Sequence, residues 1–273
     1  MARVSDEHDS PAEAESLDEA PAPKHFVRAV ARALAVIRTF DAGHPRLTLS
    51  EVATRTGLDR ATSRRLLLTL RDLGYVEQSR RDFALTPRVL ELGYSYLSGA
   101  TLVEVARPHL QHLADLLHET ASLSVLDGED VVYLDLASSR RITAVQIKVG
   151  TRFPAHATSM GRILLGELPE DELDALLERA TQTGRGERTH RSAEELRSEI
   201  RTAHERGWAI VDQELEAGLT GIAAPVRSRD GAIVAAINVS AHGVSGSIDE
   251  LARAYVPPLK QAAEEISRDY VPT

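Results

Sequence analysis

The first hundred residues show apolar positions at helical spacing, interrupted by residues that end helices. Between residues 26 and 41 apolar side chains recur every three or four positions, which predicts an amphipathic helix. A shorter helix is expected over residues 49–56, with Thr48 or Ser50 as its N-cap and Gly57 after its end. The same kind of pattern then repeats in a third segment.

A third helix is predicted to begin after the N-cap residue Asp59 and to run to about residue 73. Gly74 would end it, since glycine tolerates the left-handed conformation that follows many helices. Leu66, Leu70 and Leu73 are expected to line one face of this helix.

A β-hairpin is predicted directly after the third helix. Its strands would cover residues 75–78 and 83–85, joined by a polar turn over residues 79–82. The order helix, helix, glycine-containing turn, helix and hairpin is that of a winged helix-turn-helix. Similar patterns are common in globular proteins, so the DNA-binding interpretation depends on the side chains described below.

Two amphipathic helices, over residues 88–98 and 102–119, are expected to link this segment to the remainder of the chain. Beyond them strands are predicted over residues 121–126, 131–136, 142–148, 208–213, 221–228 and 232–240. Helices are predicted over residues 158–167, 170–181 and 193–206, and a last one after Ser247, which Pro257 and Pro258 should kink or break. About six strands on one mixed or antiparallel sheet, covered by helices, make an α+β domain.

Charge is distributed unevenly along the chain. The whole chain of 273 residues carries a net charge of −9, which at first disfavours a nucleic-acid partner. Residues 1–23, however, carry −6, residues 24–98 carry +6, and residues 99–273 carry −9. The first segment resembles a disordered acidic tail, which either screens the basic part or only solubilises the chain. The basic segment coincides with the predicted winged helix-turn-helix.

Basic and hydroxyl side chains crowd the first two turns of the third helix. A recognition helix presents base-reading groups near its N-terminus, and arginine is the commonest reader of guanine. The candidates for base contact are Arg60, Thr62, Ser63, Arg64 and Arg65. Arg80 and Arg81, in the hairpin turn, are placed to contact phosphate beside the groove. A merely solvated basic face is the alternative for all seven.

Composition narrows the remaining possibilities. The chain has no cysteine, which excludes disulfides, thiolate nucleophiles and cysteine-based zinc sites. No apolar run approaches the ~20 residues of a membrane helix, and the N-terminus lacks the pattern of a signal peptide. We expect a cytoplasmic protein that has no membrane association and needs no cofactor.

Several motifs resemble those of one family in their order along the chain. The segments ARALAVIRTF, LTLSEVATRTGLDRATSRRLLLTLRDLGYV and FALTPRVLELGYSYL resemble the N-terminal domain of IclR-family bacterial transcription regulators. The segments GTRFPAHATSMGRILLG, GWAIVDQELEAGLTGIAAPV and AAINVSAH resemble the effector-binding domain of that family. The resemblance covers about residues 25–270, and is strongest to the subgroup of PcaR, PcaU and PobR, which control protocatechuate, 4-hydroxybenzoate and β-ketoadipate catabolism.

We expect four parts in the chain. Composition indicates an acidic tail over 1–23, and with the resemblance we expect a winged helix-turn-helix over 24–86, linker helices over 87–119 and a GAF-like effector-binding domain over 120–273. The resemblance also implies a homodimer, in some relatives a pair of dimers, on a pseudo-palindromic double-stranded DNA operator. The expected effector is a small aromatic or dicarboxylic acid. A regulator of a different operon with another small-acid ligand is the alternative.

The residues themselves support a site for a small acid. The helix that starts near Thr158 offers free N–H groups to a carboxylate, and Thr158 and Ser159 add hydroxyls. Alternating polar positions on two strands would face the same side, and Arg152 or His156 could pair with a second carboxylate. The candidate ligand-binding residues are Thr158, Ser159, Met160, Gly161, Asp212, Glu214, Gly221, Asn238, Ser240 and Arg152. Some relatives carry Cys near position 221 and Ser at 238, so the ligand could differ from theirs.

Three other functions are weaker. His109, His112 and His118 lie on one predicted helix, but no further ligand completes a zinc site. Ser159, His156 and Asp212 could be combined as a hydrolase set, yet the chain lacks a G-x-S-x-G motif, a phosphate loop and a dinucleotide fingerprint. A scaffold that only dimerises would not need the arginine-rich third helix. We therefore expect a regulator and not an enzyme.

Overall fold

The computed structural model describes residues 23–93, 101–138, 147–183, 192–242 and 247–271. The acidic tail predicted over residues 1–23 therefore lies almost entirely outside the described residues. The chain forms two compact units, Met1–Tyr96 and Leu97–Thr273, and each is described by itself. Among the described residues, no helix is both long enough and apolar enough to cross a bilayer.

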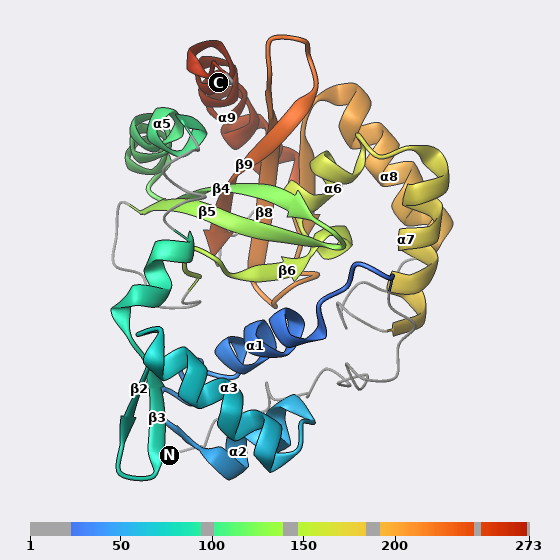
Figure 1. Ribbon diagram of the computed structural model, residues 1–273. Coiled ribbons are helices and arrows are strands. Elements are labelled where there is room, and N and C mark those ends of the chain that lie inside the picture. Colours follow the sequence, from blue (N-terminus) through green and yellow to red (C-terminus); the bar gives the residue numbers. More distant parts are fainter. Residues whose placement is uncertain (1–22, 94–100, 139–146, 184–191, 243–246, 272–273) are drawn as a thin grey trace, which may run out of the picture. The chain divides into compact units, whose positions relative to one another are not determined.

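The first unit is a three-helix domain with a small antiparallel sheet (Figure 1). Its helices are α1 (Arg28–Arg38), α2 (Leu49–Thr56) and α3 (Arg60–Asp72). The strands β1 (Leu47–Thr48), β2 (Val76–Ser79) and β3 (Asp82–Leu85) pair in the order β1-β3-β2. The winged helix-turn-helix predicted from the sequence is confirmed, and β1 adds a strand that the sequence pattern did not indicate.

Side-chain caps define where α2 and α3 begin. Thr48 and Glu51 form a capping box at α2, so that each side chain accepts a hydrogen bond from the other residue's backbone N–H. Asp59 Oδ1 accepts a hydrogen bond of 2.9 Å from the N–H of Thr62 at α3. Hydrogen bonds from Thr62 hold the pKa of Asp59 below its ordinary value. Gly57, with a φ of 69°, ends α2 in the left-handed conformation.

The core of the first unit is small and apolar, built around Val36, Val52, Leu67 and Phe83. The buried face of α3 consists of Ser63, Leu67 and Leu70. The predicted face through Leu66, Leu70 and Leu73 is therefore wrong in part, because Leu66 is only half-buried and Leu73 is 54% exposed. The helix is rotated so that the next residue along, Leu67, faces the core.

The second unit is built on a six-stranded sheet in which every neighbouring pair is antiparallel, in the order β6-β5-β4-β9-β8-β7. Its strands are β4 (Thr120–Asp127), β5 (Asp130–Ser138), β6 (Arg152–Pro154), β7 (Ala209–Asp212), β8 (Leu219–Arg227) and β9 (Ile233–His242). The predicted α+β class is confirmed, and the sheet is antiparallel. The strand predicted over residues 142–148 falls mostly outside the described residues, and Ile147 and Lys148 are not in a strand.

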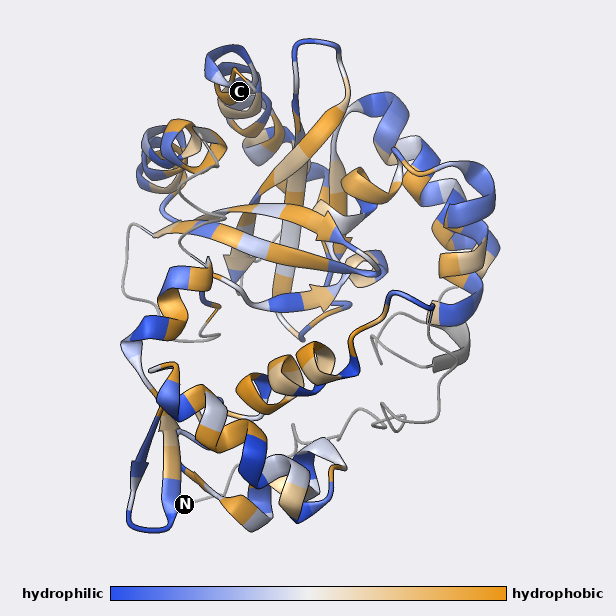
Figure 2. Ribbon diagram, viewed as in Figure 1, coloured by the Kyte–Doolittle hydropathy of each residue, from blue (hydrophilic) through white to orange (hydrophobic). Residues whose placement is uncertain are grey.

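Helices cover both faces of this sheet (Figure 1). One face packs on α5 (Thr101–Leu117) and α9 (Ile248–Asp269), with Leu110, Leu123 and Ile222 in its core. The other face packs on α6 (Ser159–Leu165), α7 (Glu170–Thr183) and α8 (Ala193–Arg206). Figure 2 shows the strands largely hydrophobic and α7 and α8 largely hydrophilic, as expected for helices with one solvent face.

The last helix is not broken by its two prolines, so of the two predicted effects only the kink stays a prediction. Pro257 and Pro258 lie inside α9, which continues as one helix from Ile248 to Asp269, so the predicted break does not occur. Each proline removes one helical N–H donor. Leu251 before the prolines and Leu259 and Ile266 after them are buried against the sheet, and this packing holds both halves of the helix in place.

The structure describes only the first part of the first predicted linker helix, but it describes the second linker helix as α5. Residues 87–89 form a 3-10 turn capped by Thr86, residues 90–93 are helical, and the remainder of the segment up to residue 100 lies outside the described residues. The second linker helix, α5, packs on the sheet of the second unit through Ala106, Leu110 and Leu113. Arg107 on α5 also forms two hydrogen bonds of 3.0 Å with the buried carboxylate of Asp135 on β5.

Candidate functional site

The N-terminal half of α3 presents three arginine side chains to solvent. Arg60, Arg64 and Arg65 are all exposed. Across the part of the chain that the structure describes, none of the three forms an ion pair with an acidic side chain. Their guanidinium groups are therefore available for bidentate contacts with base edges or phosphates.

The two hydroxyl residues predicted beside them are placed differently. Thr62 is half-buried. Ser63 is fully buried and its Oγ donates a hydrogen bond of 3.0 Å to the backbone oxygen of Asp59. Ser63 lies on the core side of α3, so it is not placed to contact DNA and we remove it from the set of base-reading residues.

The hairpin turn between β2 and β3 carries the other two predicted arginines. Arg80 and Arg81 are exposed, and Arg80 adopts a positive φ of 56°. Gln78 Nε2 donates a hydrogen bond of 3.3 Å to the backbone oxygen of Arg80, which supports the turn. Figure 2 shows the tip of this hairpin as strongly hydrophilic. The tip is a compact basic projection from the first unit.

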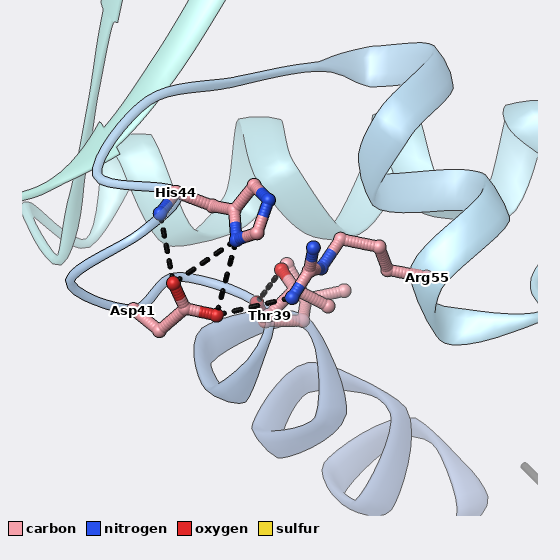
Figure 3. A network of polar contacts seen from close by, with 5 residues as sticks. Thr39, Asp41, His44 and Arg55 are labelled. Carbon is pink, nitrogen blue, oxygen red and sulfur yellow. Dashed lines mark hydrogen bonds and ion pairs between the residues drawn. The ribbon is translucent and has the colours of Figure 1, made fainter. Parts of the chain in front are cut away.

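A polar network joins the end of α1 to α2 (Figure 3). Asp41 Oδ1 accepts a hydrogen bond of 2.8 Å from the backbone N–H of His44, and Asp41 Oδ2 accepts one of 3.0 Å from Arg55. Desolvation opposes ionisation of Asp41, but the hydrogen bonds from His44 outweigh it and lower its pKa. The network holds the turn that follows α1 and ties this turn to α2, the first helix of the helix-turn-helix.

The second unit contains a small cavity between α6 and the sheet. Five of the predicted ligand-binding residues line it: Thr158, Ser159, Gly221, Asn238 and Ser240. The cavity measures only about 30 Å³, room for a few water molecules at most. The sequence analysis placed these five residues in one site, and in the structure they line one cavity, although residues 158 and 240 are far apart in the chain.

Strand register brings the polar residues together. Gly221 on β8 lies opposite Ser240 on β9, and Asn238 lies opposite Ser122 on β4. Asn238 Nδ2 donates a hydrogen bond of 3.2 Å to Ser240 Oγ. Within the described residues, Asn238 Oδ1 and Ser122 Oγ are buried without a hydrogen-bond partner. An unpaired buried polar group costs about 1–3 kcal/mol, so this face is prepared for a polar guest.

The first turn of α6 adds unpaired donors at the same place. Thr158 caps the helix, and its Oγ1 accepts a hydrogen bond of 3.0 Å from the N–H of Gly161. The backbone N–H groups of Ser159 and Met160 have no acceptor among the described residues. All of α6 is buried, so water does not freely satisfy these donors. An anion in the cavity would supply an acceptor at this end of the helix.

Further lining residues escaped the sequence analysis. Tyr133 on β5, Val211 on β7, and Ile147, Leu215 and Leu219 complete the wall together with Ala157. Burial raises the pKa of Tyr133 far above its ordinary value, so its hydroxyl stays protonated. These positions look like ordinary core residues in the sequence, and no motif or spacing distinguishes them.

Asp212 and Glu214 do not join the cavity. Val211 lies opposite Gly221 and lines the cavity, so the next residue, Asp212, points to the other face of the sheet. There Asp212 Oδ1 accepts a hydrogen bond of 2.6 Å from Thr220. The predicted shared face with Glu214 is not formed, because β7 ends at Asp212 and Gln213 turns the chain with a φ of 56°.

Glu214 instead contacts a buried arginine. Its Oε2 lies 2.6 Å from Nη2 of Arg162, whose Nη1 lies 2.6 Å from Glu199 on α8. Arg162 Nε also donates a hydrogen bond of 3.0 Å to the backbone oxygen of His156. Arg162, Glu199, Asp212 and Glu214 line a separate surface pocket of about 380 Å³.

The remaining predicted ligand residues have structural contacts. The Met160 side chain is fully buried and accepts a hydrogen bond from Ser124 at 3.1 Å. Gly161 packs so closely that an added Cβ would lie 1.9 Å from the backbone oxygen of Ala155. Arg152, on β6, binds Asp127 at 2.6 Å and Asp130 at 3.2 Å, and these contacts raise its pKa. None of these three residues lines the cavity.

The alternative sites can be located in the same way. His109 bridges α5 to α9 through contacts of 3.2 Å with Glu265 and Asp269. His112 is exposed, and His118 lies past the end of α5 with a φ of 58°. Among the described residues, no group of three or more histidine, aspartate or glutamate side chains is placed to hold a metal ion. Asp212 accepts a hydrogen bond from Thr220 and does not line the cavity that Ser159 lines. This placement argues against a hydrolase set of Ser159, His156 and Asp212.

Comparison with known proteins identifies both units. A family model described as IclR helix-turn-helix domain matches residues 29–80, and one described as bacterial transcriptional regulator IclR C-terminal matches residues 94–268. The Pca regulon regulatory protein of Pseudomonas putida is 39% identical over 242 residues, which cover 88% of this chain and 83% of that protein.

Two crystal structures extend the comparison. A Rhodococcus sp. RHA1 protein described as a transcriptional regulator is 50% identical, with a TM-score of 0.76 over 89% of this chain and 98% of that one. An IclR homolog from Microbacterium hydrocarbonoxydans, complexed with 4-hydroxybenzoate, is 26% identical, with a TM-score of 0.75 over 88% and 98% of the two chains. The chain belongs to the IclR family of bacterial transcriptional regulators.

Proposed function

We propose that this regulator controls genes of aromatic-acid catabolism and that a small aromatic or dicarboxylic acid modulates its binding to a DNA operator. The Pca regulon protein of Pseudomonas putida and the 4-hydroxybenzoate complex of the Microbacterium homolog support this class of effector. The proposed function is regulatory and not enzymatic, and it places the protein in the cytoplasm with its operator.

One observation carries the effector assignment: among the described residues, the cavity places the unpaired N–H of Ser159 near the unpaired Oδ1 of Asn238, and both residues are buried. The free N–H of Ser159, at the start of α6, would bind the carboxylate, since a helix N-terminus attracts negative charge. Asn238 and Ser240 would then meet a second polar group of the ligand. Tyr133 and Leu219 supply apolar area for a ring or a short chain.

The DNA interface is assigned to the first unit. Arg60, Arg64 and Arg65, exposed on one end of α3, would read base edges in the major groove, with Thr62 beside them. Arg80 and Arg81 in the hairpin turn would bind phosphates. Phosphate contacts fix the orientation of the protein, whereas base contacts set its sequence preference.

Dimerisation is supported by the apolar face of α1 and the segment before it. Phe26, Val27, Val30 and Leu34 are 43–60% exposed, although their type favours burial. Burial of this row against the same row of a second copy would give a symmetric dimer. Two recognition helices would then match a pseudo-palindromic operator, and a dimer of dimers would bind two such sites.

The ligand acts through a difference in affinity. An effector can shift operator binding only if it binds the DNA-competent and DNA-incompetent conformations with different strength. By the same thermodynamic linkage, operator DNA must change the affinity of the effector by the same factor.

A thermal-shift screen tests the effector class. Protocatechuate, 4-hydroxybenzoate and β-ketoadipate are each titrated into the full-length protein. A bound ligand raises the melting temperature, and above Kd the rise grows with the logarithm of the ligand concentration. We expect at least one of these acids to stabilise the protein, whereas the uncharged 4-hydroxybenzamide should not. No stabilisation by any acid would contradict the proposed effector class.

A further inference from the structure

The proposed effector cavity is too small in this conformation to hold an aromatic acid. Its volume of about 30 Å³ is far below the several hundred Å³ of a typical small-molecule pocket. Most of its wall consists of strands of the sheet and the start of α6, which are fixed by core packing. Ile147 and Leu215 are different, since neither lies in a helix or strand. Leu215 belongs to a short loop over residues 213–218 between β7 and β8.

The 213–218 loop is closed by its own hydrogen bonds. The backbone N–H of Gln213 donates to the oxygen of Leu219 at 2.8 Å, and the N–H of Gly218 donates to Gln213 Oε1 at 3.0 Å. Gln213 and Gly218 both have a positive φ, and together with these hydrogen bonds they make the loop a compact turn. Leu215 and Glu214 would move together.

Glu214 anchors this loop to the body of the second unit. The residue is 8% exposed, and its carboxylate lies 2.6 Å from the guanidinium of Arg162, which is fully buried on α6. Leu215, the next residue, lines the cavity. The ion pair therefore holds in place the part of the loop that lines the effector site.

Opening of the loop would leave no charge buried alone. If Glu214 moved outward, its carboxylate would be hydrated, and Arg162 would keep Glu199 at 2.6 Å and the backbone oxygen of His156 at 3.0 Å. The usual penalty for breaking a buried ion pair is the stranded partner, and the second glutamate reduces that penalty here. Breaking the Glu214–Arg162 ion pair should therefore cost less free energy than breaking a buried pair whose arginine has no second partner.

We infer that the Glu214–Arg162 ion pair is a latch that controls entry and exit of the effector, with Glu214 and Arg162 acting as positioning residues. The inference rests on the proposed function, because it concerns the same cavity. A latch acts on the rates of both association and dissociation. A residue that directly contacts the ligand acts mainly on dissociation.

The first test needs no ligand. Amide hydrogen exchange of full-length Glu214→Gln is compared with wild type and with Glu216→Gln, which removes the same charge from an exposed position of the same loop. We expect exchange at Gln213 and Leu219 to quicken about tenfold in Glu214→Gln and less than twofold in Glu216→Gln, because exchange tracks the open population. Equal rates in all three proteins, or equal increases in both variants, would overturn the latch.

A second variant guards against a general loss of structure. Glu214→Asp keeps the charge but shortens the side chain by one methylene, so it should weaken the contact with Arg162 while it preserves the fold. We expect intermediate exchange at Gln213 and Leu219 and unchanged protection of Ile237 in the central strand β9. Loop exchange in Glu214→Asp at the wild-type rate would count against the latch.

Ligand kinetics separate the latch from the proposed function. Trp208, the single tryptophan, stacks on Arg206, which lines the same pocket as Glu214, and serves as a stopped-flow fluorescence probe. On mixing with 4-hydroxybenzoate, both rate constants should rise about tenfold in Glu214→Gln, with Kd changed less than threefold. A change confined to the dissociation rate overturns the latch. If wild type binds none of the acids, the proposed effector class fails, while the exchange result still decides whether the loop is latched.

Discussion

A Cβ atom added at Gly221 would lie 2.8 Å from the hydroxyl oxygen of Ser159. The two residues come from β8 and from the start of α6, and they meet at the cavity that we assign to the effector. A glycine at this point leaves the space in which a ligand carboxylate would approach the free N–H groups of the helix. The relationship explains why a small residue is needed where the strand otherwise carries Ile222 and Ala223.

Gly221→Ala is therefore expected to block the effector site without unfolding the protein. The atom that the new methyl group meets is the movable end of a side chain, so the melting temperature should change little. The affinity for an effector acid should fall at least about tenfold, as measured by calorimetric titration. The double variant Gly221→Ala/Ser159→Ala removes the hydroxyl that the methyl group meets, and it should recover part of the lost affinity if the steric explanation holds.

Asn238 and Asp212 should respond differently to truncation. Asn238 is 4% exposed and lines the cavity, so Asn238→Ala should weaken effector binding about tenfold or more. Asp212 bonds to Thr220 on the other face of the sheet, so Asp212→Ala should change the effector Kd less than about threefold. A reversed order of the two effects would move the effector site to the pocket beside Arg162.

Base readout predicts a sequence-dependent loss. Arg64→Ala and Arg65→Ala should each weaken operator binding by about 1–3 kcal/mol at fixed salt and relax the preference at one base pair. Arg71→Ala is the matched control, because Arg71 lies in the last turn of the same helix and pairs with Asp72. Gel-shift titration with operator and scrambled DNA measures both quantities, and an equal effect of all three variants would show that α3 contributes only charge.

The hairpin turn should contribute affinity without sequence preference. Arg80→Ala and Arg81→Ala should weaken binding to operator and scrambled DNA alike, and each should lower the slope of log K against log salt by about 1. Fluorescence anisotropy at four or more salt concentrations gives the slope. An unchanged slope in both variants would remove the wing from the interface.

Local chemistry made much of the first unit predictable. Asp59 and Gly74 mark the ends of α3 as expected, because capping depends on the residue itself and not on distant contacts. The buried face of the same helix was misplaced by one residue, since Leu66 and Leu67 are equally apolar and only the packing decides which of them turns inward. The two-residue strand β1 carries no pattern long enough to detect.

The effector site was half predictable. Polar residues two apart on β9, Asn238 and Ser240, stand out within an apolar strand, and their alternation places both on one face. The same argument failed for Asp212 and Glu214 because Gln213 adopts a positive φ between them, which the sequence does not reveal. The role of Arg162 depends on contacts across 37 and 52 residues, and such contacts exist only in the folded unit.

The most direct test of the account is operator affinity measured by anisotropy at fixed salt, with and without 4-hydroxybenzoate or protocatechuate, in wild type and in Gly221→Ala. We predict that at least one acid changes the operator Kd of the wild type about fivefold or more, and that Gly221→Ala binds the operator normally but loses this response. An acid response of the same size in both proteins would contradict the assignment of the effector to the cavity between α6 and the sheet. The absence of any response in the wild type would contradict the proposed effector class itself.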